Sequence, residues 1–389
     1  MRTKRTNPVA GFSLIEFMIA ITVSMVILAA LTATFVSNSR ARLEIERANQ
    51  QIENGRYAVM ALTDDLQLAG YLSTFNILTE PLTLPATKKP DPCVTTATGL
   101  NAVMLMHVLG YDNSRLKPDG ATDVTCVQGG TNLLADYKAG TDILVVRRAS
   151  TCVRGSTNCP DQSGAFYFQA SMCEAQLNTI AAAHPNGPHY RLDTVGSGNL
   201  NRTARNCTTL ADMRQFFVHL YFVANNDEAG DGIPTLKRAE LIGEGGTARY
   251  RLYSLANGIE NLQIEYGIDA YGAGGPATTP DGAPDMFTAD PDEFNPAAVG
   301  TPVAACAGDC NQNWANVVSV KVSVLARNPE KTRDHDDKKI YSLGLNDDGA
   351  AQCAYDPDNN GTCDAFRDGY KRHVYQSAVR LNNVSGRRE

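Results

Sequence analysis

The run DPDNNGTCD holds the best candidate residues for metal chemistry. Asp356, Asp358 and Asn360 stand at alternate positions before a glycine, as in the opening of a calcium-binding loop, and Asp364 falls at the ninth position. Oxygen ligands around a tight turn suit a hard cation such as calcium. The twelfth position, where an EF-hand has a bidentate Glu, is Arg367, which excludes a regular EF-hand. Two interpretations remain open, a calcium loop of another kind and a plain Asp/Asn turn.

The cysteines are the second group of residues with evident chemistry. The chain has ten, and the first is Cys93. They form no C-x2-C pair of the kind that holds zinc, and their even number is typical of an exported chain with disulfides. The sequence leaves the connectivity open, although close spacing favours short loops. The candidate disulfides are Cys152–Cys159, Cys306–Cys310 and Cys353–Cys363.

Catalytic motifs are missing from the sequence. It has no nucleophile elbow, Walker A loop, H-E-x-x-H helix or dinucleotide-binding glycine fingerprint. We therefore expect no enzyme, and no cofactor beyond the candidate calcium. The 35 basic and 42 acidic residues give a net charge of -7 without a basic stripe, which argues against nucleic acid as a partner. A chain of 389 residues that is 43% hydrophobic is long enough to bury a substantial core.

The most apolar stretch lies near the N-terminus. Phe12 to Val36 is a run of 25 residues in which Glu16 is the only charged residue, and it follows the basic segment MRTKRTNPVAG. As an α-helix it would span roughly 37 Å, enough to cross the hydrocarbon core of a membrane. A secretory signal peptide is the alternative, but its apolar region is shorter, about 7–15 residues. We therefore predict a membrane-spanning helix over residues 12–36.

Glu16 is an unusual residue for such a helix. An acid costs about 2.5–3.5 kcal/mol at the bilayer centre and less near the interface, so it normally has a partner. Cutting the bond between Gly11 and Phe12 would supply one, because it leaves a free α-amino group at the start of the helix.

The segment GFSLIEFMIA, from Gly11 to Ala20, resembles the processing site of type IV prepilins and pseudopilins. The resemblance implies that residues 1–11 are a leader, which a prepilin peptidase removes before it N-methylates Phe12. It also implies that Glu16, the fifth mature residue, acts in subunit assembly by pairing with the amino group of Phe12 on a neighbouring subunit. Such a leader further implies an N-terminus in the cytoplasm.

The helix has no local reason to stop at the membrane surface, since no Gly or Pro occurs from Phe12 to Asn54. Small and apolar residues then recur on one helical face, and Asp65 lies off that face. We predict one helix from about Phe12 to Leu72, with an amphipathic half over residues 37–72; a coiled coil is the alternative. The predicted apolar stripe is Ile45, Ala48, Ile52, Gly55, Val59, Leu62, Leu66 and Ala69.

Residues 73–389 are typical of a β-rich globular domain with long loops. The alternation in VVSVKVSVL, from Val317 to Leu325, predicts a strand with one buried and one solvent-exposed face. We expect an α+β fold, in which the long helix packs on an antiparallel β-sheet with large disulfide-bonded insertions and a subdomain at about 150–210. The predicted strands are Ala102–Val108, Asp142–Arg147, Gln215–Val223, Arg249–Tyr253, Asn261–Ile268, Val317–Arg327 and Val374–Leu381.

Several segments resemble one group, the PilW-type minor pilins of the type IV pilus. GRYAVMALTDDLQLAGY, from Gly55 to Tyr71, is similar to the segment that closes the helix in that group. GTDILVVRR, GIPTLKR, LANGIENLQIEYGID and NWANVVSVKVSVLARN are similar to its strand blocks, in the expected order. The resemblance implies a single-pass inner-membrane protein that later joins a fibre running from the periplasm to the cell surface. Implied partners are other minor pilins, the major pilin, an inner-membrane assembly platform and a large tip adhesin.

The role implied by this resemblance is to help initiate pilus assembly and to form part of the complex at the fibre tip or base, in the service of surface attachment and twitching motility. Two alternatives remain open. A minor pseudopilin of a type II secretion system would carry the same leader. A membrane-tethered, calcium-binding adhesive ectodomain would carry the same apolar helix without a fibre.

Overall fold

The computed structural model describes residues 11, 13–80, 84, 90–111, 126–183, 189–271, 279–292, 311–346, 349–358 and 360–388. The chain divides into two compact units, Met1–Gln50 and Gln51–Glu389. Helix α1 (Leu14–Leu68) contributes to both units.

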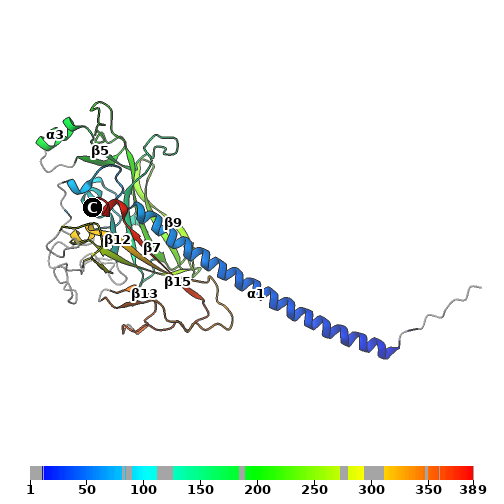
Figure 1. Ribbon diagram of the computed structural model, residues 1–389. Coiled ribbons are helices and arrows are strands. Elements are labelled where there is room, and N and C mark those ends of the chain that lie inside the picture. The colour runs from blue at the N-terminus through cyan, green and yellow to red at the C-terminus, as the bar shows by residue number, and fades with distance from the viewer. Residues whose placement is uncertain are drawn as a thin grey trace, which may run out of the picture. The chain divides into compact units, whose positions relative to one another are not determined.

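Helix α1 confirms the continuous N-terminal helix (Figure 1). Its buried face differs from the predicted stripe. Ile52 is 47% exposed, whereas Gln51 and Asp65 are buried. Both buried polar residues have partners on the strands, which is why they can share the inner face with Leu62 and Leu66.

The larger sheet has seven strands, paired in antiparallel fashion. Its strands are β1 (Val108–Tyr111), β4 (Ile143–Ala149), β5 (Phe166–Ala170), β6 (Tyr190–Thr194), β7 (Arg214–Ala224), β8 (Thr235–Glu244) and β9 (Thr247–Asn257). Strand β7 is central, because it pairs with β4, β5 and β8. The segment 150–210 thus adds two strands, β5 and β6, to this sheet.

The second sheet has four antiparallel strands in the order β11-β10-β12-β15. They are β10 (Ile259–Ile268), β11 (Met286–Thr288), β12 (Val317–Arg327) and β15 (Arg372–Arg380). Two hairpins pair β2 (Val127–Gln128) with β3 (Thr131–Asn132) and β13 (Ser342–Leu345) with β14 (Ala351–Cys353). The short helices are η1 (Ile77–Thr79), α2 (Ala97–Ala102), α3 (Glu174–Ala183), α4 (Asn311–Ala315) and α5 (Asn382–Ser385).

The α+β class is confirmed, with a long helix packed on antiparallel strands and disulfides in the loops. The strands form two larger sheets rather than one, and the strand predicted over residues 102–108 is wrong. Helix α2 ends at Ala102, and β1 begins only at Val108. A local cap explains the helix, because Thr96 Oγ1 accepts the N–H of Gly99 at 3.2 Å.

The solvent-exposed face predicted for β12 is also wrong. Ser319 and Ser323 are only 9% and 5% exposed. The chain beyond β12 folds back on this face, where Leu325, Tyr341 and Leu343 form a second apolar cluster. Lys321, which lies between the two serines, keeps a side chain that is 41% exposed, so the pattern here marks one buried apolar face and one largely buried mixed face.

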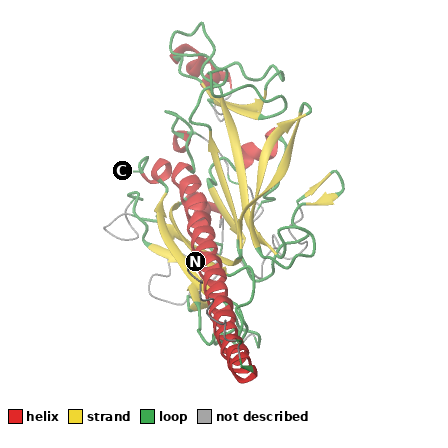
Figure 2. Ribbon diagram, turned by 90° about the vertical axis from the view of Figure 1, so that its right-hand side faces the viewer, coloured by secondary structure: helices red, strands yellow, loops and turns green. Residues whose placement is uncertain are grey.

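The main core lies between α1 and the strands of both sheets (Figure 2). Gln51 Nε2 donates to the carbonyl of Ala326 on β12 at 2.8 Å, at the start of this contact. At its other end, Asn383 of α5 donates from Nδ2 to the carbonyls of Gln67 and Ala69, each at 3.3 Å, and so caps the end of α1. The rings of Tyr266 and Trp314 are buried in this core, with their centroids 4.8 Å apart.

Candidate functional site

The predicted processing site lies at the start of α1. Gly11 is exposed, and a Cβ added to it would meet no atom within 4 Å. Phe12 lies outside the described residues, so the cleavage and N-methylation of this junction stay predictions.

Glu16 lies in the first turn of α1 and makes a local hydrogen bond. Its Oε2 accepts the backbone N–H of Ser13 at 2.9 Å, and Ser13 Oγ accepts the N–H of Ile15 at 3.3 Å. These two bonds form a variant of the capping box, in which Ser13 accepts the N–H of Ile15 rather than that of Glu16, and the macrodipole of the helix further favours an acid at this end. Sequence reasoning missed the box, although its S-x-x-E signature can be read at residues 13–16.

The side chains of the apolar part of α1 are not covered by other described residues of the chain. An 18-residue window of this helix has a mean hydropathy of 2.5 and no buried residue, and by length and composition it could cross a membrane. Such a surface needs lipid or other apolar helices to cover it. The exposed large side chains are Leu14, Ile15, Phe17, Met18, Ile19, Ile21, Val23, Met25, Val26, Ile27, Leu28, Leu31, Phe35 and Val36.

Hydroxyl groups within the apolar stretch are satisfied by the helix itself. Ser24 Oγ donates to the carbonyl of Ala20 at 2.7 Å, and Thr32 Oγ1 donates to that of Leu28 at 2.9 Å. The hydroxyl of Thr34 does the same one turn back, to Ala30. Bonds of this kind let hydroxyl side chains enter a water-free environment without an unpaired polar group.

The second half of α1 approaches β15 closely at one residue. A Cβ added to Gly55 would lie 2.2 Å from Cε2 of Tyr375, a distance that no side chain can occupy. Gly55 is therefore required for packing rather than for backbone freedom, because it lies within a helix. It is also the first residue of the GRYAVMALTDDLQLAGY segment.

Asp65 joins α1 to two strands of the larger sheet. Its Oδ1 accepts from Nε of Arg148 on β4 at 2.7 Å, and its Oδ2 lies 2.7 Å from Nδ1 of His219 on β7. The hydroxyl of Tyr221 donates to the same Oδ2 at 2.9 Å. The cluster is buried, so each polar group depends on these partners and not on water. The prediction that Asp65 lies off the inner face is wrong.

The charges around His219 determine its ionisation. Burial lowers the pKa of His219, but Asp65 and Glu240 outweigh that effect and raise it above its ordinary value of 6.5. Burial likewise raises the pKa of Asp65, yet His219 and Arg148 hold it well below 3.8. Nε2 of His219 lies 3.8 Å from Glu240, whose other partner is Arg238 at 2.8 Å. The cluster thus holds α1 by charge as well as by shape.

A second buried cation holds the four-stranded sheet to the chain that follows β12. The side chain of Arg372 is fully buried and binds Glu260 on β10. Its Nη1 lies 3.0 Å from Asp337 and 2.6 Å from Asp368. Three carboxylates therefore surround one guanidinium, whose planar donors suit such contacts.

Four pairs of cysteines lie at disulfide distance. Their Cα atoms are 5.4 Å apart in Cys93–Cys126, 6.2 Å in Cys152–Cys159, and 5.0 Å in both Cys173–Cys207 and Cys353–Cys363. Cys306 and Cys310 lie outside the described residues. Sequence reasoning missed the two long pairs, whose partners are 33 and 34 residues apart, because it favoured short loops.

The candidate calcium residues lie in an exposed loop after β14. The carboxylate of Asp356 accepts the N–H groups of Asn360 and Gly361 at 3.2 and 2.8 Å, and Oδ1 of Asn360 accepts that of Thr362 at 2.7 Å. These bonds are typical of an Asp/Asn turn. Within the described ranges, no three His, Cys, Asp or Glu side chains gather to hold a metal ion, and this includes Asp358 and Asp364.

Two family models match the chain. The model for Type IV Pilus-assembly protein W (PilW) matches residues 220–383, which include β8 to β15. The model for the prokaryotic N-terminal methylation motif matches residues 6–32, which include Gly11, Phe12 and Glu16.

The comparison with curated proteins gives no match. Among solved structures, a type IV-like pilin from Thermus thermophilus is similar at 10% identity and a TM-score of 0.23, over 63% of this chain and 78% of that one.

Proposed function

The chain is a type IV pilin-like protein of the PilW type, and on this premise we propose that it is a minor pilin subunit that helps initiate type IV pilus assembly. In this role it forms part of the complex at the fibre tip or base, and it supports surface attachment and twitching motility. The observation that carries the proposal is the exposed apolar part of α1, which contains Glu16 in its first turn and has no buried residue in its most apolar window.

This helix suits a subunit that moves from the lipid of a membrane into the apolar core of a fibre. Lipid covers the exposed side chains while the subunit waits in the inner membrane, and neighbouring helices cover them in the fibre. Both surroundings satisfy the same apolar surface, so extraction does not require the helix to refold. The domain after residue 50 stays on the periplasmic side, where its disulfides can form.

Glu16 would determine the axial offset between neighbouring subunits in the fibre. In the free subunit its carboxylate is satisfied by the N–H of Ser13, so the acid is already held at the first turn. After removal of residues 1–11, the amino group of Phe12 on an adjacent subunit can pair with Glu16 and neutralise both charges in the fibre core. A buried pair of this kind specifies the axial offset more than it adds stability.

Different partners act on the subunit during processing, extraction and assembly. A prepilin peptidase processes the junction of Gly11 and Phe12, and an inner-membrane assembly platform extracts the subunit. Other minor pilins, the major pilin and a large tip adhesin contact it in the fibre. These contacts are structural, and we assign no chemical reaction to the chain.

The first test is the mass of the mature N-terminus. We expect the protein purified from membranes to begin at an N-methylated Phe12. A product that still begins at Met1 would exclude this processing and with it the pairing of Glu16.

The second test uses Glu16→Ala beside Glu46→Ala, which removes an exposed acid of the same helix beyond the apolar stretch. Both variants should be processed, but only Glu16→Ala should be lost from sheared surface fibres. Normal incorporation of Glu16→Ala would contradict the pairing. Wild-type protein found only in membranes would favour the tethered ectodomain, and dependence on type II secretion genes would favour the pseudopilin.

A further inference from the structure

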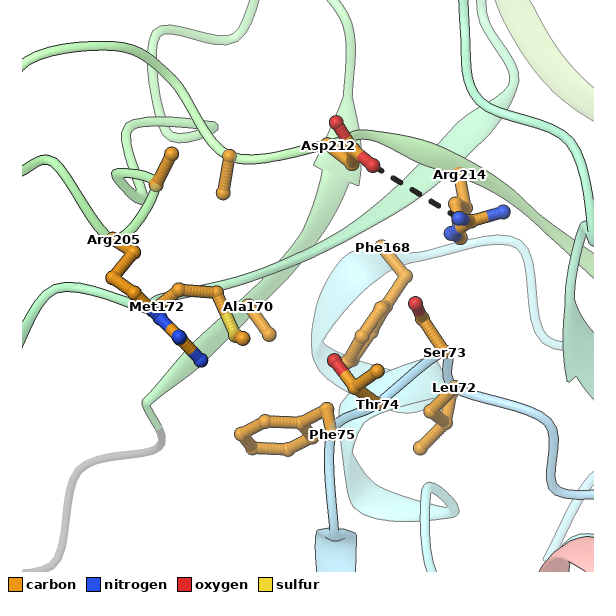
Figure 3. Close-up of a pocket in the computed structure, with 12 residues that line it drawn as sticks. Leu72, Ser73, Thr74, Phe75, Phe168, Ala170, Met172, Arg205, Asp212 and Arg214 are labelled. Carbon is orange, nitrogen blue, oxygen red and sulfur yellow. Dashed lines mark ion pairs between the residues drawn. The ribbon is translucent and has the colours of Figure 1, made fainter.

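A pocket of about 480 Å³ opens beside the segment that follows α1 (Figure 3). Its floor is apolar, and includes the buried ring of Phe168, the half-buried ring of Phe75 and the exposed thioether of Met172. The rings of Phe75 and Phe168 lie 5.7 Å apart and support each other. The volume falls within the range of roughly 300–1,000 Å³ that is usual for ligand pockets.

The walls of this pocket are held by the surrounding chain. The disulfide Cys173–Cys207 ties the end of β5 to the loop that carries Arg205. On the opposite wall, Ser73 has a φ of 58°, a left-handed conformation that non-glycine residues seldom adopt. Strained residues of this kind often occur at ligand clamps. The pocket is therefore a built feature of the fold.

The rim of the pocket is positive. Arg205 is exposed and makes no ion pair with any residue that the structure describes. Arg214 is 13% exposed; its Nη1 donates to the carbonyls of Ser150 and Thr151, whereas its Nε has no hydrogen-bond partner in the described part of the chain. The acid of the lining is Asp212, 69% exposed and 3.9 Å from Arg214. The lining thus carries two guanidinium groups and one carboxylate, and Arg205, on the side of the pocket away from Asp212, is available to an acid of a partner (Figure 3).

The position of the pocket indicates which partner can reach it. Helix α1 enters the domain at Gln51, and the pocket begins at Leu72, beyond the end of the helix. The helix rises about 26 Å between Gln51 and Leu68. The pocket therefore lies at the end of the domain remote from Gln51, where a subunit stacked on that end could insert a segment.

We propose that this pocket receives an extended segment of a neighbouring pilin subunit, with an apolar side chain on the floor and an adjacent carboxylate on the rim. The apolar floor favours an apolar side chain, and the excess of guanidinium groups favours a carboxylate. A segment that has only one of these two groups would leave either the floor or the rim without a complementary partner. The inference rests on the proposed function for the identity of the partner.

A binding experiment tests the chemistry of the pocket. The mature full-length chain in detergent is titrated into fluorescein-labelled acetyl-Gly-Asp-Phe-Asp-Leu-Gly-amide, and fluorescence anisotropy is recorded. We expect saturable binding that Arg205→Glu weakens about tenfold and that added salt also weakens. Thr74 is an exposed residue of the lining. The larger side chain in Thr74→Trp should block the opening of the pocket and abolish binding.

The matched controls separate charge and shape from general effects. Arg333→Glu makes the same charge change at an exposed residue outside the lining and should leave binding unchanged. The peptide with Ala in place of Phe should not bind. Absence of binding by the wild type, or equal binding by the wild type, Arg205→Glu and Thr74→Trp, would overturn the proposal.

A photo-crosslinking amino acid at Thr74 tests the partner in intact cells. We expect a product with an acidic, aromatic-containing segment of another pilin subunit, and its loss with Arg205→Glu. A product with a second copy of this chain or with a protein outside the pilus would overturn the proposal. If the chain is present in sheared fibres without the expected product, only this inference fails; if it is absent from fibres, the proposed function fails.

Discussion

The carboxylate of Asp65 on α1 lies 2.7 Å from the imidazole Nδ1 of His219 on β7, and both side chains are buried. An apolar contact tolerates small displacements along a helix, but a carboxylate with fixed partners on two strands does not. The pair therefore sets the position of α1 against the seven-stranded sheet. Substitution at Asp65 can measure this contribution.

Replacing Asp65 should destabilise the domain strongly. Asp65→Asn leaves the buried charges of His219 and Arg148 without their counter-charge, and we expect the free energy of unfolding to fall by about 3–5 kcal/mol. Asp64→Asn changes the exposed neighbour and should stay within about 0.5 kcal/mol of wild type. Urea denaturation of the full-length protein, followed by circular dichroism, measures both. Equal effects of the two variants would show that Asp65 does not hold the helix.

The ionisation of His219 should make stability depend on pH above neutrality. Its pKa in the folded protein is raised above 6.5, so its stabilising contribution is complete below about pH 6.5 and is lost as the pH rises through the raised value. The free energy of unfolding should then fall by at most about 1.4 kcal/mol per pH unit. Urea denaturation at a series of pH values should show this decline for the wild type and not for His219→Gln.

His107 should act in the opposite direction. Its burial, together with Arg387, Arg388 and Arg147, lowers the pKa of His107 to about 3. The folded protein therefore favours the neutral ring, and stability is lost as the pH falls from about 6.5 toward 3. His107→Gln should reduce this acid-side loss in the same denaturation series. A wild-type profile that shows no acid-side loss attributable to His107 would contradict the assignment.

Gly55 offers a test in which helix propensity and packing predict opposite signs. In an exposed helix Gly→Ala would add roughly 1 kcal/mol of stability. Here the added methyl meets the ring of Tyr375, so Gly55→Ala should destabilise the domain by about 1–3 kcal/mol. The double variant Gly55→Ala with Tyr375→Leu should recover part of that loss in chemical denaturation. A stabilising effect of Gly55→Ala alone would rule out the close contact.

Arg372 should be essential for the packing of the chain after β12. Arg372→Met leaves Glu260, Asp337 and Asp368 crowded without a cation, and we expect a loss of about 3–5 kcal/mol. Arg333→Met removes an exposed guanidinium from the same stretch of chain and should have little effect. Thermal unfolding of the two variants provides the comparison, and similar midpoints would contradict a buried role for Arg372.

Local patterns in the sequence predicted the helices, the strands and the family resemblance. They predicted less well which side chains of different helices and strands contact each other. The apolar run, the absence of Gly and Pro, and the β-branched stretches are local signals, and they indicate α1 and strands such as β7, β10 and β12. The local pattern places Asp65 on the wrong face because its partners, Arg148 and His219, lie 83 and 154 residues away in the sequence. No pattern in the sequence near Asp65 predicts these two partners.

The same limit explains the remaining differences. The outer face of β12 looks solvent-exposed until the chain at Tyr341 and Leu343 covers it. The disulfide Cys173–Cys207 depends on a fold that brings distant cysteines together, whereas spacing favours near neighbours. Ser13 and Glu16 are different, because their S-x-x-E spacing is a local pattern that can be read from the sequence.

The bond from Asn383 to the carbonyl of Gln67 has a consequence for biogenesis, since it joins residues 316 positions apart. A chain that emerges N-terminus first presents its anchoring helix long before β15 and α5 exist to close over it. Until Asn383 has been made, the carbonyls at the end of α1 therefore lack the side-chain amide that caps them. A product truncated before residue 383 would keep this end of the helix open.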